Sequence, residues 1–450
     1  MITAAALPPV TAAAPLPQAE SLWGELTAAT VADGRGKAGE AAVGIARVIL
    51  PLPAPDAEGY SIVAGDNLRE RLIETHYGLR GGIVPGDNAP LALNNLLDRG
   101  DFIPSLRKIL EDCRRLADRC GLELSVTPLE YECRGRKAVF PFMKLASPID
   151  PGDDVVVLSA GVHGEETACI RGLWRAMEYL FKEAQDKQVK LVILPAVNPS
   201  GYENSLRSNI EGRKPGVTTN YDGCLYVLKN GRVLADLHSG RDIESGDVYE
   251  VAEVRWVDDP ALARLTGEPV LQLPPETAAM RRALYQIEAG GARVAAFLHG
   301  HDDIWTVDRG NGNATVPLTY QYAHSGAVHM LPAIGRIRSS TGACLYANTD
   351  LEYNALNGNA LPDGTLLRPD AGGYMPRDFG DPRYHELTDE NGFVNHVQDG
   401  CFGEAVAHVH GVPFCVTLEV SSALERPEEV FAAWGQAAID FAAKRRHLGD

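Results

Sequence analysis

The sequence predicts an α/β fold, in which a mixed, twisted central sheet carries helices on both faces. Two patterns over residues 101–450 indicate this fold: short apolar runs alternate with longer segments whose apolar residues recur at helical spacing. Strands that are apolar throughout are typical of a sheet that helices cover on both sides. Residues 1–100 are instead rich in Pro, Ala and Gly, which predicts an N-terminal extension or small accessory module ahead of one large domain.

The first half of the large domain is expected to open with a helix at 106–120, where apolar residues recur every three or four positions with charged residues between them. Apolar runs and turn residues place the elements that follow. They are strands at 122–131, 137–145 and 155–160, a helix with Ile170, Leu173, Met177 and Leu180 on one stripe, and a strand at 191–197 that ends in the turn sequence NPSG.

The second half contains two more helix and strand pairs. They are a helix at 275–289 with a strand at 294–298, and a strand at 413–420 with a closing helix that carries Val430, Phe431 and Trp434 inward. Residues 300–400 interrupt this rhythm, since Gly, Asn, Asp and Pro are frequent there. We expect long loops in this stretch, and loops at strand ends commonly carry functional sites.

The charge of the chain argues against several kinds of partner. With 42 Lys and Arg against 60 Asp and Glu, the formal net charge is −18, which disfavours binding to nucleic acid or to an anionic membrane surface. No apolar run approaches the ~20 residues that span a bilayer, and no basic residue precedes the apolar N-terminus as in a secretory signal. The eight cysteines are scattered without a CxxC pair, so we expect reduced thiols in a cytoplasmic enzyme.

The sequence SAGVHGEE contains the most specific chemical signal. His163 and Glu166 lie where an apolar strand ends and a helix begins, and the H-x-x-E spacing lets an imidazole and a carboxylate converge on one cation. Such donors suit zinc, and a catalytic zinc site takes a third protein ligand from elsewhere in the chain. The alternative is structural, since Glu165 and Glu166 would also complement the dipole of the helix.

Two histidines compete for the place of the third ligand, and each follows an apolar run. His238 lies in VLADLHSG and His299 lies in VAAFLHGHDD. His301 is two residues beyond His299 and shares its face if the chain stays extended, so it is an alternative ligand or a support for one. A structural role is the alternative for each of them.

Glu419 is a single carboxylate in the otherwise apolar strand PFCVTLEV. Because burying an unpaired charge is unfavourable, this residue needs a metal, a cation or a proton to transfer. Beside an activated water it would act as a general base and later protonate the leaving amine. A buried salt bridge is the structural alternative.

Taken in order, these motifs resemble the zinc metallocarboxypeptidase family of the carboxypeptidase A/B type, over residues 101–450. The matching segments are the RGR turn at 134–136, His163 and Glu166, NPSGYE at 198–203, PPET at 274–277, and Thr417 with Glu419. The resemblance implies one Zn²⁺ per chain, and it places the third ligand on the strand after the PPET helix, which favours His299 over His238. DLHSG also resembles the zinc-histidine segment of succinylglutamate desuccinylase and aspartoacylase relatives, which keeps His238 open.

The departures from the family concern substrate recognition. The Asn-Arg pair that clamps a C-terminal carboxylate in the family is missing at 236–239, so Arg207, Arg213 or Arg241 is expected to provide the fork. The family's tyrosine just before the catalytic glutamate is also missing. Tyr374 and Tyr384 lie farther away and His396 nearer, and Tyr374 is the candidate for substrate binding.

The predicted function is that of a zinc-dependent amide hydrolase acting on a peptide or an aminoacylated small molecule. Activated water would attack the carbonyl, Glu419 would accept its proton, and a nearby arginine would stabilise the oxyanion. One alternative is an N-acyl amino acid deacylase of the desuccinylase/aspartoacylase kind. A second is a catalytically inactive binding protein on the same fold.

Overall fold

The structure is a computed structural model of the full chain. It describes residues 52–63, 65–72, 101–133, 135–235, 249–303, 306–308, 315–326, 329, 332–333, 336–337, 344–346, 400–422 and 424–448. Residues from Ile49 onward form one compact unit.

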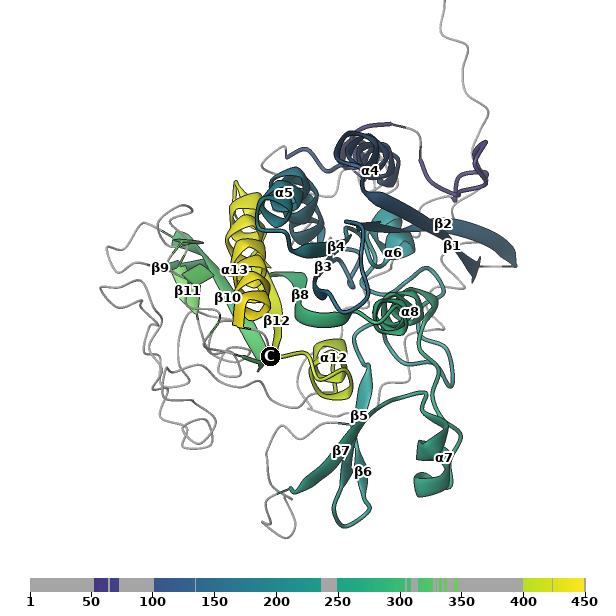
Figure 1. Ribbon diagram of the computed structural model, residues 1–450. Coiled ribbons are helices and arrows are strands. Elements are labelled where there is room, and N and C mark those ends of the chain that lie inside the picture. Colours follow the sequence, from purple (N-terminus) through teal and green to yellow (C-terminus); the bar gives the residue numbers. More distant parts are fainter. Residues whose placement is uncertain are drawn as a thin grey trace, which may run out of the picture. The chain divides into compact units, whose positions relative to one another are not determined.

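A nine-stranded mixed sheet forms the centre of this unit (Figure 1). Its order is β1-β2-β4-β3-β8-β12-β10-β11, and β9 pairs with β10. The strands are β1 (Glu123–Cys133), β2 (Arg136–Ala146), β3 (Asp154–Ala160), β4 (Lys190–Leu194), β8 (Arg293–Asp303), β9 (Thr306–Asp308), β10 (Thr315–Ser325), β11 (Cys344–Tyr346) and β12 (Phe414–Ser421). The four central strands, β4, β3, β8 and β12, are parallel, so their carboxyl ends meet at one edge.

The helices cover both sides of the central strands, which confirms the predicted α/β class. They are α4 (Leu106–Cys120), α5 (Thr167–Asp186), α6 (Pro199–Asn204), α7 (Pro260–Thr266), α8 (Pro275–Ala289), α12 (Phe402–Val409) and α13 (Pro427–Leu448). Figure 1 shows α5 and α13 packed side by side against β3 and β8, with α8 across the sheet from them. Within the described residues, no helix has the length and apolar character needed to cross a bilayer.

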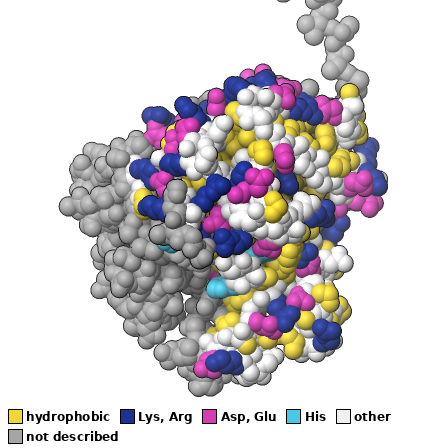
Figure 2. All heavy atoms as spheres, in the orientation of Figure 1, with side chains coloured by type: hydrophobic (Ala, Val, Ile, Leu, Met, Phe, Trp, Pro, Cys, Tyr) yellow, Lys and Arg dark blue, Asp and Glu magenta, His cyan; other side chains and the backbone are white. Residues whose placement is uncertain are grey.

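A second, smaller sheet lies beside α12. It is antiparallel, with the order β6-β5-β7, and consists of β5 (Cys224–Leu228), β6 (Val233–Leu234) and β7 (Val251–Trp256). Over the face shown in Figure 2, Lys and Arg side chains are interspersed with Asp and Glu. The negative net charge is therefore not gathered into one broad patch on that face.

The prediction of loops over residues 300–400 is wrong for residues 315–325, because these residues form β10, a strand of the main sheet. β10 lies antiparallel to β12 and parallel to β11. Its sequence TVPLTYQYAHS is rich in the β-branched and aromatic residues that favour strands. Most of the rest of that stretch lies outside the described residues.

The core extends into the segment ahead of α4. Ile62, Leu68 and Leu72 are buried in the same hydrophobic cluster as the helices and the sheet. The buried Glu203 on α6 fastens this segment, since it accepts hydrogen bonds from the backbone N–H of Val63 at 2.8 Å and from Arg71 at 2.6 Å. Part of the expected N-terminal extension, residues 52–63 and 65–72, thus packs against the large domain.

Glu276, in the first turn of α8, is fully buried and is expected to make stability depend on pH. Its carboxylate accepts hydrogen bonds from Tyr131 and Asn209, at 3.1 and 3.0 Å. Burial raises its pKa to about 7, above the value of the unfolded chain. The stabilisation that the protonated carboxyl contributes is therefore fully present below about pH 4.5 and is lost as the pH rises through about 7.

The substitution Glu276→Gln is expected to remove this pH dependence, because the amide stays neutral. As the pH rises from 4.5 to 8, the wild type loses the stabilisation from Glu276 and the variant does not. The unfolding free energy of the variant minus that of the wild type should therefore increase by on the order of 3 kcal/mol over this range. Denaturant unfolding of both proteins across this range measures the difference. Glu203, whose pKa is also raised to about 7 by burial, titrates in both proteins and cancels. Parallel stability curves would contradict the prediction.

Candidate metal centre

The carboxyl ends of β3 and β8 bring two distant segments together. Ser159 pairs with His299 and Ala160 with Gly300 in this parallel ladder. The loop of residues 161–166 leaves β3 here and leads into α5, while β8 continues to Asp303. Ligands are commonly bound at such strand ends in α/β proteins.

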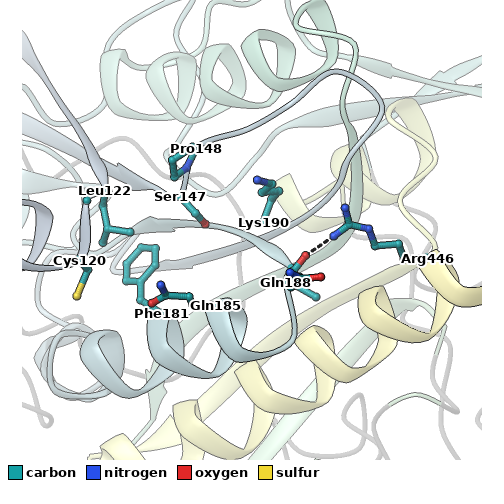
Figure 3. Close-up of a pocket in the computed structure, with 11 residues that line it drawn as sticks. Cys120, Leu122, Ser147, Pro148, Phe181, Gln185, Gln188, Lys190 and Arg446 are labelled. Atoms are coloured by element: carbon teal, nitrogen blue, oxygen red, sulfur yellow. Dashed lines mark hydrogen bonds between the residues drawn. The ribbon is translucent and has the colours of Figure 1, made fainter.

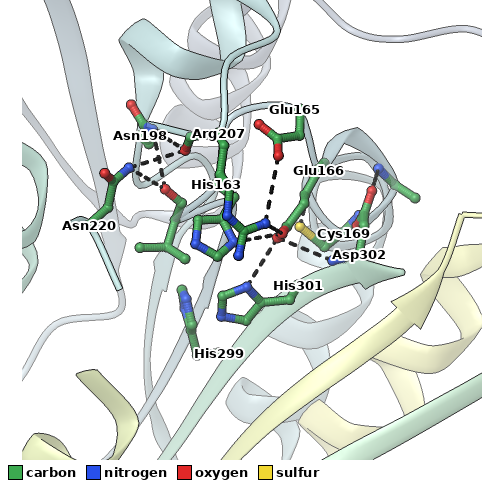
Figure 4. A network of polar contacts seen from close by, with 12 residues as sticks. His163, Glu165, Glu166, Cys169, Asn198, Arg207, Asn220, His299, His301 and Asp302 are labelled. Carbon is green, nitrogen blue, oxygen red and sulfur yellow. Dashed lines mark hydrogen bonds and ion pairs between the residues drawn. The ribbon is translucent and has the colours of Figure 1, made fainter. Parts of the chain in front are cut away.

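His163, Glu166 and His301 converge at this edge (Figure 4). Nδ1 of His163 lies 2.6 Å from Oε1 of Glu166, and Nδ1 of His301 lies 3.1 Å from Oε2 of the same carboxylate. One ligand atom from each residue lies within 4.8 Å of the others, and all three side chains are buried. Two imidazole nitrogens and a carboxylate oxygen are the donor types that zinc binds in catalytic sites.

The ionisation states of the group suit a divalent cation. Burial lowers the pKa of His163 to about 4, so its imidazole is neutral at pH 7. Burial acts to raise the pKa of Glu166, but the neighbouring His163 and His301 outweigh it and hold the pKa below its usual value. Metal ligands must be deprotonated, and these two residues already are at neutral pH.

His299, expected as the third ligand, lies two residues before His301 on β8, in register with Ser159 of β3. Its Nδ1 lies 2.6 Å from the hydroxyl of Ser159 instead of facing Glu166. The strand expected to end at Leu298 continues to Asp303, so His301 on the same face of β8 is the histidine that reaches Glu166. The structure therefore brings His301, the alternative histidine of the HGH sequence, together with His163 and Glu166.

The loop that carries His163 is held against α6. A Cβ atom on Gly164 would lie 2.0 Å from the backbone of Gly201, so this close approach requires glycine at position 164. The Asn198 and Asn220 side-chain amides both donate to the carbonyl of Val162, at 3.2 and 2.7 Å. The NPSG turn thus supports the H-x-x-E loop.

Of the three arginines that the sequence offered for substrate binding, Arg207 lies beside His163, Glu166 and His301. Its guanidinium pairs with Glu165 at 3.7 Å and Glu166 at 3.5 Å, and its side chain is 54% exposed. Arg213 lies exposed farther along the same segment. Three other predicted residues, His238, Arg241 and Tyr374, lie outside the described residues.

Tyr221 is a neighbour of the group that the sequence analysis missed. Its ring centroid lies 5.9 Å from that of His163 and 5.6 Å from that of His301, so it packs against both histidines. It stands in the turn-rich sequence TTNYDG, which has no local pattern that would single it out.

Glu419 lies on the strand next to His301. In the parallel pairing of β12 with β8, Glu419 is in register with His301 and Thr417 with His299. Register partners on neighbouring strands, ~4.8 Å apart, project from the same face of a sheet. The half-buried Glu419 side chain therefore shares the face on which His301 meets Glu166.

A separate cavity of about 370 Å³ lies near the end of α4 (Figure 3). It is lined by Cys120, Gln188, Lys190 and Arg446, among others. Its two cationic side chains pair with Asp153, at 3.6 Å from Lys190 and 3.8 Å from Arg446. Lys190 begins β4, so this cavity lies at the opposite ends of the parallel strands from the His163 group.

The chain is similar to several solved structures, and three of them are compared by sequence identity, by the share of each chain that is covered and by TM-score. A candidate metallopeptidase from Shewanella amazonensis shares 17% identity, over 76% of this chain and 94% of its own, with a TM-score of 0.39. A metallo-carboxypeptidase from Burkholderia cenocepacia shares 13% identity, over 76% of this chain and 70% of its own, with a TM-score of 0.38. Thrombin activatable fibrinolysis inhibitor shares 12% identity, over 76% of this chain and 78% of its own, with a TM-score of 0.41.

Neither a protein-family model nor a curated protein sequence matches the chain. We therefore infer the function from the geometry of the site.

Proposed function

We propose that this protein is a metal-dependent amide hydrolase in which His163, Glu166 and His301 hold one zinc ion. The observation that carries the proposal is the convergence of two imidazole nitrogens on one buried carboxylate at the carboxyl ends of β3 and β8. Three protein ligands are the number that a catalytic zinc site uses. The proposal takes His301 in place of the expected His299.

Zinc bound there would supply Lewis acidity and lower the pKa of a water molecule to ~7. The protein contributes the surroundings. Neutral His163 and ionised Glu166 have the protonation states that binding requires, and Tyr221 packs against both histidine rings.

Glu419 is the general base of the proposed reaction. Its register with His301 supports this role, because register partners on neighbouring strands project from the same face of a sheet. It accepts the proton of the attacking water and then delivers it to the leaving nitrogen, as a carboxylate poised between two proton transfers does.

Arg207 is the cation for the substrate. Its side chain is 54% exposed and lies within 4 Å of the carboxylates of Glu165 and Glu166. A guanidinium there stabilises either the oxyanion or a carboxylate of the substrate. We propose a peptide or an aminoacylated small molecule as the substrate class.

Metal analysis combined with a substrate screen tests the proposal. We expect one zinc per chain, and hydrolysis that a chelator abolishes and added zinc restores. A panel of peptides with free C-termini and N-acyl amino acids identifies the bond, and release of an acid such as succinate without peptide cleavage would favour the deacylase alternative. His163→Ala is the control, and equal zinc in this variant and the wild type would show that the site is wrong.

A further inference from the structure

The helix α5 begins directly at the metal group, with an unusual cap. Glu166 is its N-cap residue, but the Glu166 side chain makes no capping hydrogen bond. Its carboxylate is instead directed to His163 and His301. The first N–H groups of a helix need acceptors, and the N-cap side chain normally provides one. Another residue must therefore satisfy these donors.

Asp302 supplies the missing cap from β8. Its two carboxylate oxygens accept the backbone N–H groups of Ala168 and Cys169, the second and third residues of α5. Its own backbone N–H donates to Oε2 of Glu166 at 3.3 Å. Asp302 as a whole is 8% exposed, and Figure 4 shows its side chain on the α5 side of Glu166.

This arrangement ties both halves of the metal group together. Asp302 follows His301 directly, and neighbouring residues of a strand point to opposite faces. One face of β8 thus presents His301 to Glu166, while the other clamps the helix that starts at Glu166. Without the Asp302 carboxylate, the unsatisfied N–H groups of α5 would compete for the carboxylate of Glu166.

We propose that Asp302 is a positioning residue for metal binding: it caps α5 in place of Glu166 and so leaves the Glu166 carboxylate to the ion. The inference rests on the proposed function, because it concerns the same metal group. Outer-shell partners of metal ligands typically contribute 10- to 100-fold to affinity, and Asp302 is expected to contribute within that range.

Zinc affinity of Asp302→Ala and Asp302→Asn tests the proposal. Purified proteins are stripped of metal and titrated with zinc against a chromophoric chelator, and with Co²⁺ while the visible absorption of the bound ion is recorded. We expect ~10- to 100-fold weaker zinc binding for the alanine variant, with an altered Co²⁺ spectrum. The asparagine variant keeps one acceptor oxygen, so it should recover part of the affinity. It also keeps the test decisive if the alanine variant does not fold.

Ser105→Ala provides a matched control. Ser105 is the N-cap of α4, and its hydroxyl accepts the N–H of Lys108 at 3.1 Å. Losing this cap should lower the melting temperature without changing zinc affinity. Wild-type affinity in both Asp302 variants, with only a lower melting temperature, would overturn the inference and leave the proposed function intact. A wild-type protein that binds no zinc would overturn both.

Discussion

Replacing Glu419 with Gln is expected to remove nearly all hydrolytic turnover and to leave the bound metal in place. The amide keeps the shape of the side chain but cannot accept the proton of the attacking water. General base catalysis typically contributes 10²–10⁴-fold, so kcat should fall by ~10³-fold. Glu419 stands one strand away from His301 and outside the group of three converging donors, so zinc content should remain at one per chain.

The control is the same chemical change at Glu130 on β1. This carboxylate is 63% exposed and pairs with Lys137 at 3.1 Å, so Glu130→Gln should retain wild-type turnover. Steady-state kinetics and metal analysis on the three proteins decide the matter. A fully active Glu419→Gln protein would refute the assignment of the base, and loss of zinc in that variant would make Glu419 a ligand instead.

Most of the helices and strands could be predicted because each one has its own periodic signal. The apolar stripe of α8 predicts Pro275–Ala289, and the structure has the helix with these bounds. The H-x-x-E loop was equally readable, since a buried strand, a turn and a helix follow one another in the sequence. These features depend on contacts between residues close in the chain, which local patterns record.

The end of β8 could not be predicted in this way. HGHDD is polar and looks like a loop, but β12 pairs with β8 from Ala296 through Asp303. A strand partner more than 100 residues away therefore decides where β8 ends, and no local pattern contains it. The strand continues to Asp303, five residues beyond the expected end at Leu298, and the histidine in contact with Glu166 is His301 and not His299.

Asp302 illustrates the same limit for hydrogen bonds. The acceptor for the first turn of α5 is normally sought at the N-cap position, here Glu166. The structure supplies it from a residue far along the sequence, beside a ligand rather than at a helix start. Capping in this form is visible only once β8 and α5 are placed together.

Parallel substitutions of the two histidines of β8 are expected to separate their roles. His301→Asn removes the imidazole whose Nδ1 lies 3.1 Å from Glu166, so zinc affinity should fall by more than the ~100-fold that marks the upper end for outer-shell partners. Hydrolysis should fall with it, below detection at stoichiometric zinc. His299→Asn makes the same change two residues away on the same face of the strand, and its amide can still bond to Ser159.

The expected result for His299→Asn is zinc affinity within a few-fold of the wild type, because its Nδ1 is engaged at 2.6 Å by the Ser159 hydroxyl. Both variants lose a buried ring of the same size, so any common loss of stability cancels in the comparison. Chelator competition gives the two affinities, and unfolding of the metal-free proteins gives the two stabilities. The opposite ranking, with zinc lost in His299→Asn and kept in His301→Asn, would restore His299 as the ligand. That outcome would require the His299 side chain to turn away from the Ser159 hydroxyl and towards Glu166 on metal binding.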